Sequence, residues 1–388
     1  MLKGFILPGL LASALLSGCA GTLSQMNMPS SEVQQVAQNG RALSVDELVT
    51  EYMHSKQVSG MVVAVIKHNG PATFYCYGIT DDKNRYPITP DTLFALGSLS
   101  KGITAEVITL LVNEGRLHWD DTLSTLLPPG TPLSDDAQKI TLIQLVTHTS
   151  GLPRQPMNLL SLEHLLRYLR DGENFYQDLD SDGVLNYLSS FRAPLNREPI
   201  YSNLGYAILG YILKYQTGQS IETLSAQRLF QPLGMANTSF NPETLRAYPH
   251  RALGHAGDQP KLIARGALTP DWQFSNNMVG AASLYSDARD LIEYTRAHFS
   301  ATDSQALNKV FSDVSVNYYP REKEAANIAW ITDTYGPQKI TYQVGYIGGY
   351  SSYIGFDKQN QNAVLVLQNS FNWSNYIGHA LLKRIAPE

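Results

Sequence analysis

The sequence is poor in cysteine and in charge, and both shortages narrow what the protein can be. Its 388 residues include two cysteines, and 16% of them are charged, with a formal net charge of −5. The chain has no GxxxxGK[ST] phosphate loop, no His-Glu-x-x-His helix and no cysteine pair at zinc spacing. A charge of this sign and size gives no reason to expect nucleic acid as a partner. We therefore expect no metal, no organic cofactor and no nucleic-acid binding.

A long uncharged apolar run opens the chain. The stretch MLKGFILPGLLASALLSGCA has one early lysine, then apolar residues, then small ones. This pattern predicts a secretory signal, because the run is too short and wrongly flanked for a stable membrane span. Leu16-Ser17-Gly18-Cys19 resembles a bacterial lipobox, in which the cysteine carries lipid. The alternative is an ordinary signal peptide that is cleaved nearby.

The lipobox reading fixes the first segments of the chain. Residues 1–18 are then a lipoprotein signal peptide, and Cys19 attaches the protein to a membrane of the cell envelope, at the periplasmic face of the outer membrane if the cell is Gram-negative. Cys76 is left without an intrachain partner. It lies in the alternating apolar stretch TFYCYG, and we expect it to be a small buried hydrophobic side chain.

The rest of the chain divides by its periodicity. Residues 19–43 are polar and predict a tether, and the folded domain is expected over 44–388. Ser44 is placed to cap a helix over SVDELVTEYMHSK. Two β-rich runs flank Asn69-Gly70, which is a strong hairpin signal. Helical spacing dominates the middle of the chain, and strand-like runs return near its end.

This order predicts an α+β fold. The first and last strands form one antiparallel sheet, flanked by helices, in a lobe of residues 44–95 and 325–388. Residues 96–324 form a mostly helical second lobe. A small-molecule site is expected where the two lobes meet.

Ser98 and Lys101 form the single Ser-x-x-Lys of the chain, at the start of a helical run. Residues three apart share a helix face, so the hydroxyl and the amine are expected to be neighbours. A serine is a weak nucleophile until a base takes its proton. The helix dipole and burial both disfavour a charged lysine, so Lys101 could act as that base. Ser100 would point elsewhere and serve as scaffold.

Tyr201-Ser202-Asn203 precedes another helical run. A phenol can relay a proton, and an amide can hold both a lysine and a substrate amide. The alternative is structural: Asn203 is a good N-cap residue, and Tyr201 could pack against the helix that follows.

Taken together, these motifs and their order resemble the penicillin-binding-protein and β-lactamase superfamily. The resemblance is to the branch with class C β-lactamases, D-Ala-D-Ala carboxypeptidases and β-lactamase-like esterases. It is carried by YPITPDTLFALGSLSKGITA, TLIQLVTHTSGLP, LFQPLGMANTSF and MVGAASLYSDARDL, and it covers about residues 45 to 385.

The resemblance implies a role for each matching residue. Ser98 would be the acylated nucleophile, Lys101 its general base and Tyr201 the proton relay. Asn203 would contact the substrate and the lysine. The backbone N–H groups of Ser98 and Gly349 would form an oxyanion hole.

One motif departs from the family. Tyr346-Ile347-Gly348 stands where the branch has Lys-Thr-Gly or His-x-Gly, so a neutral phenol replaces a cation. We expect weak binding of carboxylated substrates unless an arginine, Arg154 or Arg289, reaches the site, although both are expected at the surface. The branch uses no histidine at His148, which we expect to be a hydrogen-bonding loop residue.

The sequence thus predicts a secreted serine hydrolase that forms an acyl-enzyme at Ser98. The expected substrate is a peptide or amide bond in cell-wall muropeptides. A carboxylesterase on small acyl esters and a β-lactamase are the alternatives within the superfamily. A non-catalytic envelope sensor or scaffold that keeps the fold is an alternative of another class.

Overall fold

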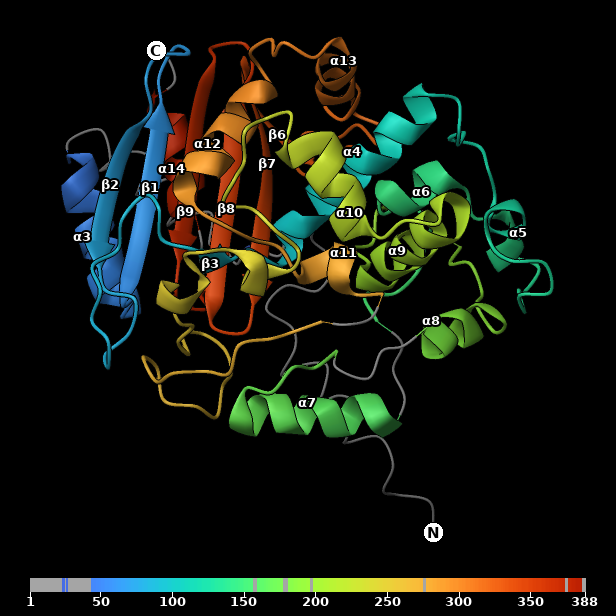
Figure 1. Cartoon of the computed structure of the whole chain (residues 1–388), viewed down its shortest axis with the longest axis horizontal. Coiled ribbons are helices and arrows are strands. Elements are labelled where there is room, and N and C mark those ends of the chain that lie inside the picture. Colours follow the sequence, from blue (N-terminus) through green and yellow to red (C-terminus); the bar gives the residue numbers. More distant parts are fainter. Residues whose placement is uncertain are drawn as a thin grey trace.

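The computed structural model describes residues 23–24, 26, 43–155, 159–176, 181–195, 198–274, 277–373 and 376–385. A seven-stranded sheet in the order β2-β1-β9-β8-β7-β6-β5 lies beside a helical lobe (Figure 1). The strands that pair in this sheet are antiparallel. The expected α+β class and the joining of N- and C-terminal strands are confirmed. None of the described helices is long and apolar enough to span a membrane.

The strands of the main sheet are β1 (Gly60–Ile66), β2 (Thr73–Gly78), β5 (Ala325–Ala326), β6 (Ile331–Tyr335), β7 (Gln338–Ile347), β8 (Tyr350–Asp357) and β9 (Asn362–Gln368). The Asn69-Gly70 hairpin is present, with Val65 opposite Thr73 in the register. Asn69 has a φ of 54°, a left-handed conformation that asparagine tolerates better than most residues. A separate two-stranded ribbon pairs β3 (Phe94–Ala95) with β4 (Tyr285–Ser286).

Helices cover both faces of the sheet. On one face lie α3 (Val45–Lys56) and α14 (Ile377–Ile385), and α12 (Ala288–Ala297) lies on the other. The side chains of β1 alternate between the two faces of the sheet. Met61, Val63 and Val65 join the core beneath α3 and α14, whereas Val62, Ala64 and Ile66 join the core beneath α12. This period of two explains why β1 is apolar throughout. Ser44 caps α3 as expected, in a capping box with Glu47.

The helical lobe is built around α4 (Ser100–Asn113), whose residues from Ser100 to Leu111 are all buried. The other helices of this lobe are α5 (Leu123–Leu126), α6 (Leu142–Val146), α7 (Leu159–Asp171), α8 (Ser181–Leu188), α9 (Asn203–Thr217), α10 (Ile221–Ser225), α11 (Val279–Ala282) and α13 (Gln305–Asp313). The α12 helix, expected in the helical lobe, packs on β1, β8 and β9, because its strongly one-sided apolar stripe fits the sheet.

The predicted tether is wrong in part. Leu23 and Met26 are buried against the core shared by α3, α14 and the sheet. The Glu324 carboxylate accepts hydrogen bonds from the backbone N–H groups of Leu23 and Ser24, at 2.9 Å each. Composition missed this contact because Glu324 lies 300 residues away in the chain. Cys19 and the signal segment lie outside the described residues.

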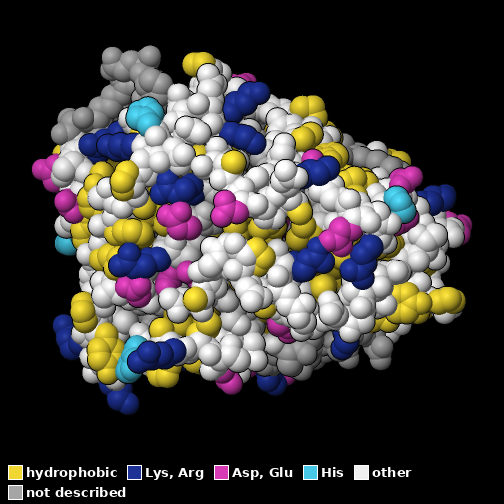
Figure 2. Space-filling view, turned by 45° about the horizontal axis from the view of Figure 1, so that its top comes forward, with side chains coloured by type: hydrophobic (Ala, Val, Ile, Leu, Met, Phe, Trp, Pro, Cys, Tyr) yellow, Lys and Arg dark blue, Asp and Glu magenta, His cyan; other side chains and the backbone are white. Residues whose placement is uncertain are grey.

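On the face of the molecule shown in Figure 2, lysine and arginine side chains are interspersed with aspartate and glutamate.

Cys76 is half-buried on the edge strand β2 rather than fully buried as expected. Burial raises the pKa of its thiol, which makes the thiol less reactive than an ordinary cysteine.

Candidate active site

Ser98 lies in a single 3₁₀ turn, Gly97–Leu99, that leads directly into α4. The turn packs against the C-terminal end of β7. Gly97 has a φ of 54°, and a Cβ at this position would lie 2.8 Å from the Tyr346 carbonyl oxygen. A glycine is therefore required both by the backbone conformation and by the close approach of the strand. This contact places the serine at the junction of the two lobes.

Three side chains meet at the Ser98 hydroxyl. The Lys101 Nζ lies 3.0 Å from Ser98 Oγ, and the Tyr201 hydroxyl donates to the same oxygen at 2.6 Å. Lys101 also donates to the Ala281 carbonyl oxygen at 2.9 Å. The predicted grouping of Ser98, Lys101 and Tyr201 is thus present in space, although Tyr201 is 103 residues away from the serine.

The environment favours a neutral lysine. The Lys101 side chain is 2% exposed, and burial, helped by the nearby Arg154 charge, holds its pKa well below the usual value. The rings of Tyr201 and Tyr206, 5.0 and 5.7 Å from Nζ, favour the ammonium form by cation–π attraction. That attraction is worth about 0.5–2 kcal/mol and opposes the effect of burial, which remains the larger influence on the pKa of Lys101. A neutral amine can accept the Ser98 proton while donating to Ala281.

Tyr201 remains a protonated phenol at neutral pH. Burial raises its pKa, and the hydrogen bond to Ser98 and the Arg154 charge offset only part of that rise. Tyr201 therefore donates a proton in this site rather than acting as an anionic base.

The other two candidate groups near the serine are structural. Ser100 is fully buried; its hydroxyl donates to the Gly97 carbonyl at 2.6 Å and accepts from the Leu284 N–H at 3.0 Å. His148 Nδ1 accepts from the backbone N–H of Ser202 at 3.1 Å. Burial, with a smaller effect of the Lys101 charge, lowers the pKa of His148 to about 3. Both residues hold the site together as expected, Ser100 as scaffold and His148 as a loop hydrogen-bonding group.

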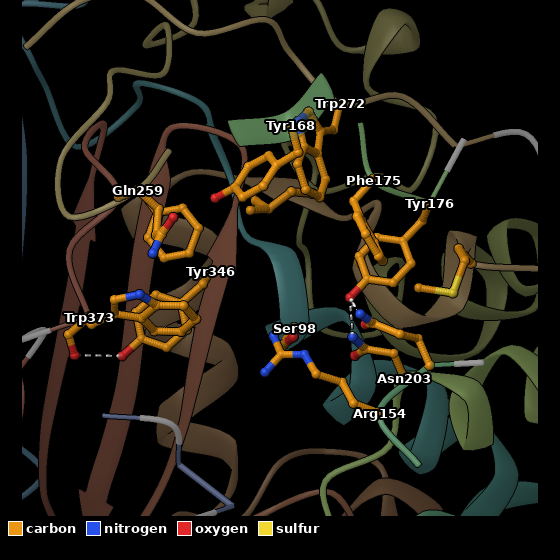
Figure 3. A pocket seen from close by; sticks show the side chains of 15 residues that line it. Ser98, Arg154, Tyr168, Phe175, Tyr176, Asn203, Gln259, Trp272, Tyr346 and Trp373 are labelled. Carbon is orange, nitrogen blue, oxygen red and sulfur yellow. Dashed lines mark hydrogen bonds between the residues drawn. The ribbon is translucent and has the colours of Figure 1, made fainter. Parts of the chain in front are cut away.

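Asn203 is at the site but has a different partner. It is the first residue of α9, and Ser202 rather than Asn203 caps that helix. Its amide donates to the Tyr176 hydroxyl at 2.8 Å, and Tyr176 in turn donates to Gln155 Oε1 at 2.9 Å. The partner of the Asn203 amide is thus the Tyr176 hydroxyl (Figure 3), where the sequence predicts Lys101.

An open pocket of about 800 Å³ lies over Ser98. Its walls are largely aromatic. They comprise Tyr168, Phe175, Tyr176 and Trp272 on one side and Tyr346, Phe371 and Trp373 on the other (Figure 3). Sequence reasoning missed these residues other than Tyr346. The stretches NFYQD and PDWQF are locally rich in aromatic residues. Nothing in the local sequence indicates that these aromatic side chains face one pocket.

The Tyr346-Ile347-Gly348 motif lies at the end of β7. The Tyr346 ring stacks on Phe371, with centroids 5.5 Å apart, and its hydroxyl donates to the Trp373 carbonyl at 3.3 Å. Gly348 and Gly349 form the two-residue turn between β7 and β8. The Gly349 carbonyl accepts from the His255 N–H at 3.1 Å.

This geometry gives no support to Gly348 or Gly349 as substrate-binding residues. Neither is among the residues that line the pocket, whereas Tyr346 and Ile347 are. The short turn packs Gly349 against Gly254 and His255, away from the pocket lining. The oxyanion donor expected at Gly349 remains a prediction.

The two arginines differ. Arg154 lines the pocket, and its guanidinium carbon lies 5.7 Å from the centre of the Tyr201 ring. Arg289 is on the surface and pairs with Asp91 at 2.7 Å. Within the described part of the chain, no group of three or more His, Cys, Asp and Glu could hold a metal ion.

Known proteins are similar to this chain over most of its length. The family profile described as Beta-lactamase matches residues 45–386. A β-lactamase of Pseudomonas fluorescens is 25% identical over 369 residues, covering 85% of this chain and 94% of the relative. The D-alanyl-D-alanine-carboxypeptidase/endopeptidase AmpH of Escherichia coli K12 is 24% identical, covering 93% of this chain and 91% of the relative.

Solved structures share the fold. A class C β-lactamase from Rhodobacter sphaeroides superposes with a TM-score of 0.73 at 23% identity, over 88% of this chain and 98% of the other. A β-lactamase/D-alanine carboxypeptidase from Pseudomonas syringae gives 0.72 at 21% identity, over 92% and 100%. With the Ser98, Lys101 and Tyr201 constellation inside the matched range, the chain belongs to the β-lactamase family and is a serine hydrolase.

Proposed function

We propose that the protein hydrolyses its substrate through an acyl-enzyme on Ser98. The neutral amine of Lys101 takes the Ser98 proton as Oγ attacks the carbonyl carbon of the substrate. The bond between the carbonyl carbon and the leaving group breaks; Tyr201 gives its proton to the leaving group and regains one from Lys101, which is then neutral again. A water then attacks the ester at Ser98 and releases the acid. The observation that carries this proposal is the meeting of Lys101 Nζ and the Tyr201 hydroxyl at Ser98 Oγ, at 3.0 and 2.6 Å.

The proposed substrate is a peptide or amide bond of the kind found in cell-wall muropeptides. Two side-chain amides, Gln155 and Asn203, line the pocket beside Ser98, and such groups can pair with a peptide group. The carboxypeptidase/endopeptidase named among the relatives supports this choice. Tyr176 must give up its bonds to both amides before a substrate amide can use them.

An ester substrate is the second candidate. The aromatic walls suit an apolar acyl group, and the neutral Tyr346 replaces the family's cation. An ester also depends less on a proton from Tyr201 than an amide does, because an alkoxide is a better leaving group than an amide anion.

Active-site labelling tests the proposal. A fluorophosphonate and a fluorescent penicillin are each incubated with the purified protein, and the mass of the intact chain is measured. We expect one adduct with at least one probe, on the peptide that contains Ser98, and none in Ser98→Ala. If neither probe adds mass, the enzymatic proposal fails and a non-catalytic sensor or scaffold becomes the better description.

A substrate panel separates the hydrolase options. Rates with p-nitrophenyl esters, nitrocefin and D-Ala-D-Ala peptides are compared under one condition. We expect peptide cleavage to exceed β-lactam turnover, and a protein that turns over only esters would replace the first candidate by the second.

We also propose that Cys19 carries a lipid that holds the protein at the cell envelope. The support is the Leu-Ser-Gly-Cys sequence at the end of an apolar run. Metabolic labelling with palmitate in the native host should mark the wild type and not Cys19→Ala; equal labelling of the two would refute the anchor.

A further inference from the structure

The pocket over Ser98 carries a single charge. Among the described residues that line it, Arg154 is the only one with a charged side chain, and the others are aromatic, aliphatic or neutral polar. A cation in a largely apolar pocket attracts anions, because low-polarity walls weaken screening by water.

Arg154 is fixed where it can reach the reacting group. Its carbonyl oxygen accepts from the N–H groups of Asn203 and Leu204, at 3.0 and 3.1 Å. These bonds hold its backbone to the start of α9, the segment that also carries Tyr201. The guanidinium lies over the Tyr201 ring and points into the cavity beside Ser98 (Figure 3).

The opposite wall is neutral and aromatic. Tyr346, Phe371 and Trp373 form a contiguous aromatic cluster, with ring centroids 4.8 to 5.5 Å apart. A surface of this kind binds an aromatic or other bulky apolar group by burying its area. It offers no cation at the position where the family has one.

We propose that Arg154 is the specificity residue that binds a carboxylate on the substrate of Ser98, while the Tyr346, Phe371 and Trp373 wall holds an apolar group of the same substrate. Charge recognition would thus lie in the loop between α6 and α7 rather than at the end of β7. A guanidinium suits this role because its planar donors match a carboxylate. The inference rests on the proposed acylation of Ser98.

A matched pair of substrates tests the proposal. Two p-nitrophenyl esters share one aromatic acyl group and differ in a single substituent, a carboxylate in one and its carboxamide in the other. Values of kcat/KM at pH 7 are measured for the wild type, Arg154→Gln and Arg154→Lys. The control is Arg289→Gln, which removes an arginine that pairs with Asp91 on the surface.

The wild type should prefer the carboxylate by about 10- to 100-fold, as charged hydrogen bonds commonly do. The preference should shrink at high salt, vanish in Arg154→Gln, persist in part in Arg154→Lys and remain whole in Arg289→Gln. A wild type without preference overturns the inference. So does an Arg154→Gln variant that slows both esters equally, because Arg154 would then act only through Lys101.

The failure of this inference can be told from failure of the proposed function. If a fluorophosphonate labels Ser98 in the wild type but the two esters are hydrolysed alike, carboxylate recognition by Arg154 is wrong and the acyl-enzyme stands. If Ser98 takes no label and neither ester is turned over, both proposals fall.

Discussion

At the scale of single residues, the chemistry depends on the protonation of Lys101. Its amine is buried between Ser98, Ala281 and the Tyr201 and Tyr206 rings, and Arg154 is the charged group that faces it. The neighbouring His148 is neutral, because burial lowers its pKa to about 3. Lys101 is thus the base that we propose for Ser98.

The pH profile should report this base. Because the pKa of Lys101 is lowered, kcat/KM for an uncharged ester should rise with pH and level off below the pH at which an ordinary lysine titrates. Arg154→Gln removes a positive neighbour, so the pKa of Lys101 should rise and the acid limb should move to higher pH. An Arg289→Gln control should keep the wild-type limb. An unmoved limb in Arg154→Gln would contradict the assigned cause.

His148 gives a second prediction. In His148→Ala, the buried N–H of Ser202 loses its acceptor, which costs about 1–3 kcal/mol, and the Tyr201 ring loses a neighbour 4.6 Å away. We expect lower stability and a lower kcat/KM with an unchanged shape of the pH profile. His148→Asn, which keeps an acceptor, should restore part of both. Loss of one limb of the profile in His148→Ala would instead make the histidine catalytic.

At the scale of elements, the site depends on how closely β7 approaches the turn that carries Ser98. Gly345 lies where the strand meets that turn, and a Cβ there would collide with the Leu96 carbonyl oxygen and with Ser352 Oγ. The Ser352 hydroxyl already donates to the Leu96 carbonyl at 2.9 Å. The strand and the turn therefore form one rigid unit.

Gly345→Ala should separate the two elements. Overpacking of this kind costs about 1–3 kcal/mol, and the displacement of Ser98 from Lys101 and Tyr201 should reduce acylation more than it reduces stability. Thermal unfolding and the rate of fluorophosphonate labelling measure the two effects. The control is Gly205→Ala in α9, where the nearest atom to a new Cβ is Ser202 Oγ at an ordinary 3.4 Å. A Gly345→Ala protein labelled as fast as the wild type would refute the coupling.

At the scale of the whole molecule, the N-terminal segment joins the domain. Leu23 is 1% exposed and packs in the core beneath α3 and α14, and Glu324 fixes its backbone. If Cys19 is lipidated, three residues separate the lipid from this contact, so the docked segment would hold the domain close to the membrane.

The free energy of unfolding tests the docking. Leu23→Ala should destabilise the protein by about 2–5 kcal/mol, the usual cost of truncating a buried leucine. Leu262→Ala, at a site that is 71% exposed, should change it by no more than about 0.5 kcal/mol. Equal unfolding curves for the two variants would mean that the segment does not stay docked in solution.

The sequence predicted those features of the fold that depend on residues close together in the chain. The capping box of Ser44 and Glu47, the Asn69-Gly70 hairpin and the pairing of Ser98 with Lys101 each depend on residues within a few positions of one another. Short-range backbone geometry determines such features, so spacing alone predicts them. The family resemblance added Tyr201 and Asn203, whose order along the chain is a property of the sequence.

Tertiary structure decided the rest. The docking of Leu23 on Glu324, the shift of α12 to the sheet and the aromatic walls of the pocket join residues that are far apart in the chain. The same holds for Arg154, which the sequence places at the surface and which lines the pocket because its loop, between α6 and α7, is bonded to the start of α9. The sequence by itself determined the pairing of Ser98 with Lys101, because the two residues are three positions apart and share one helix face; the surroundings that select a substrate arise only when distant segments pack together.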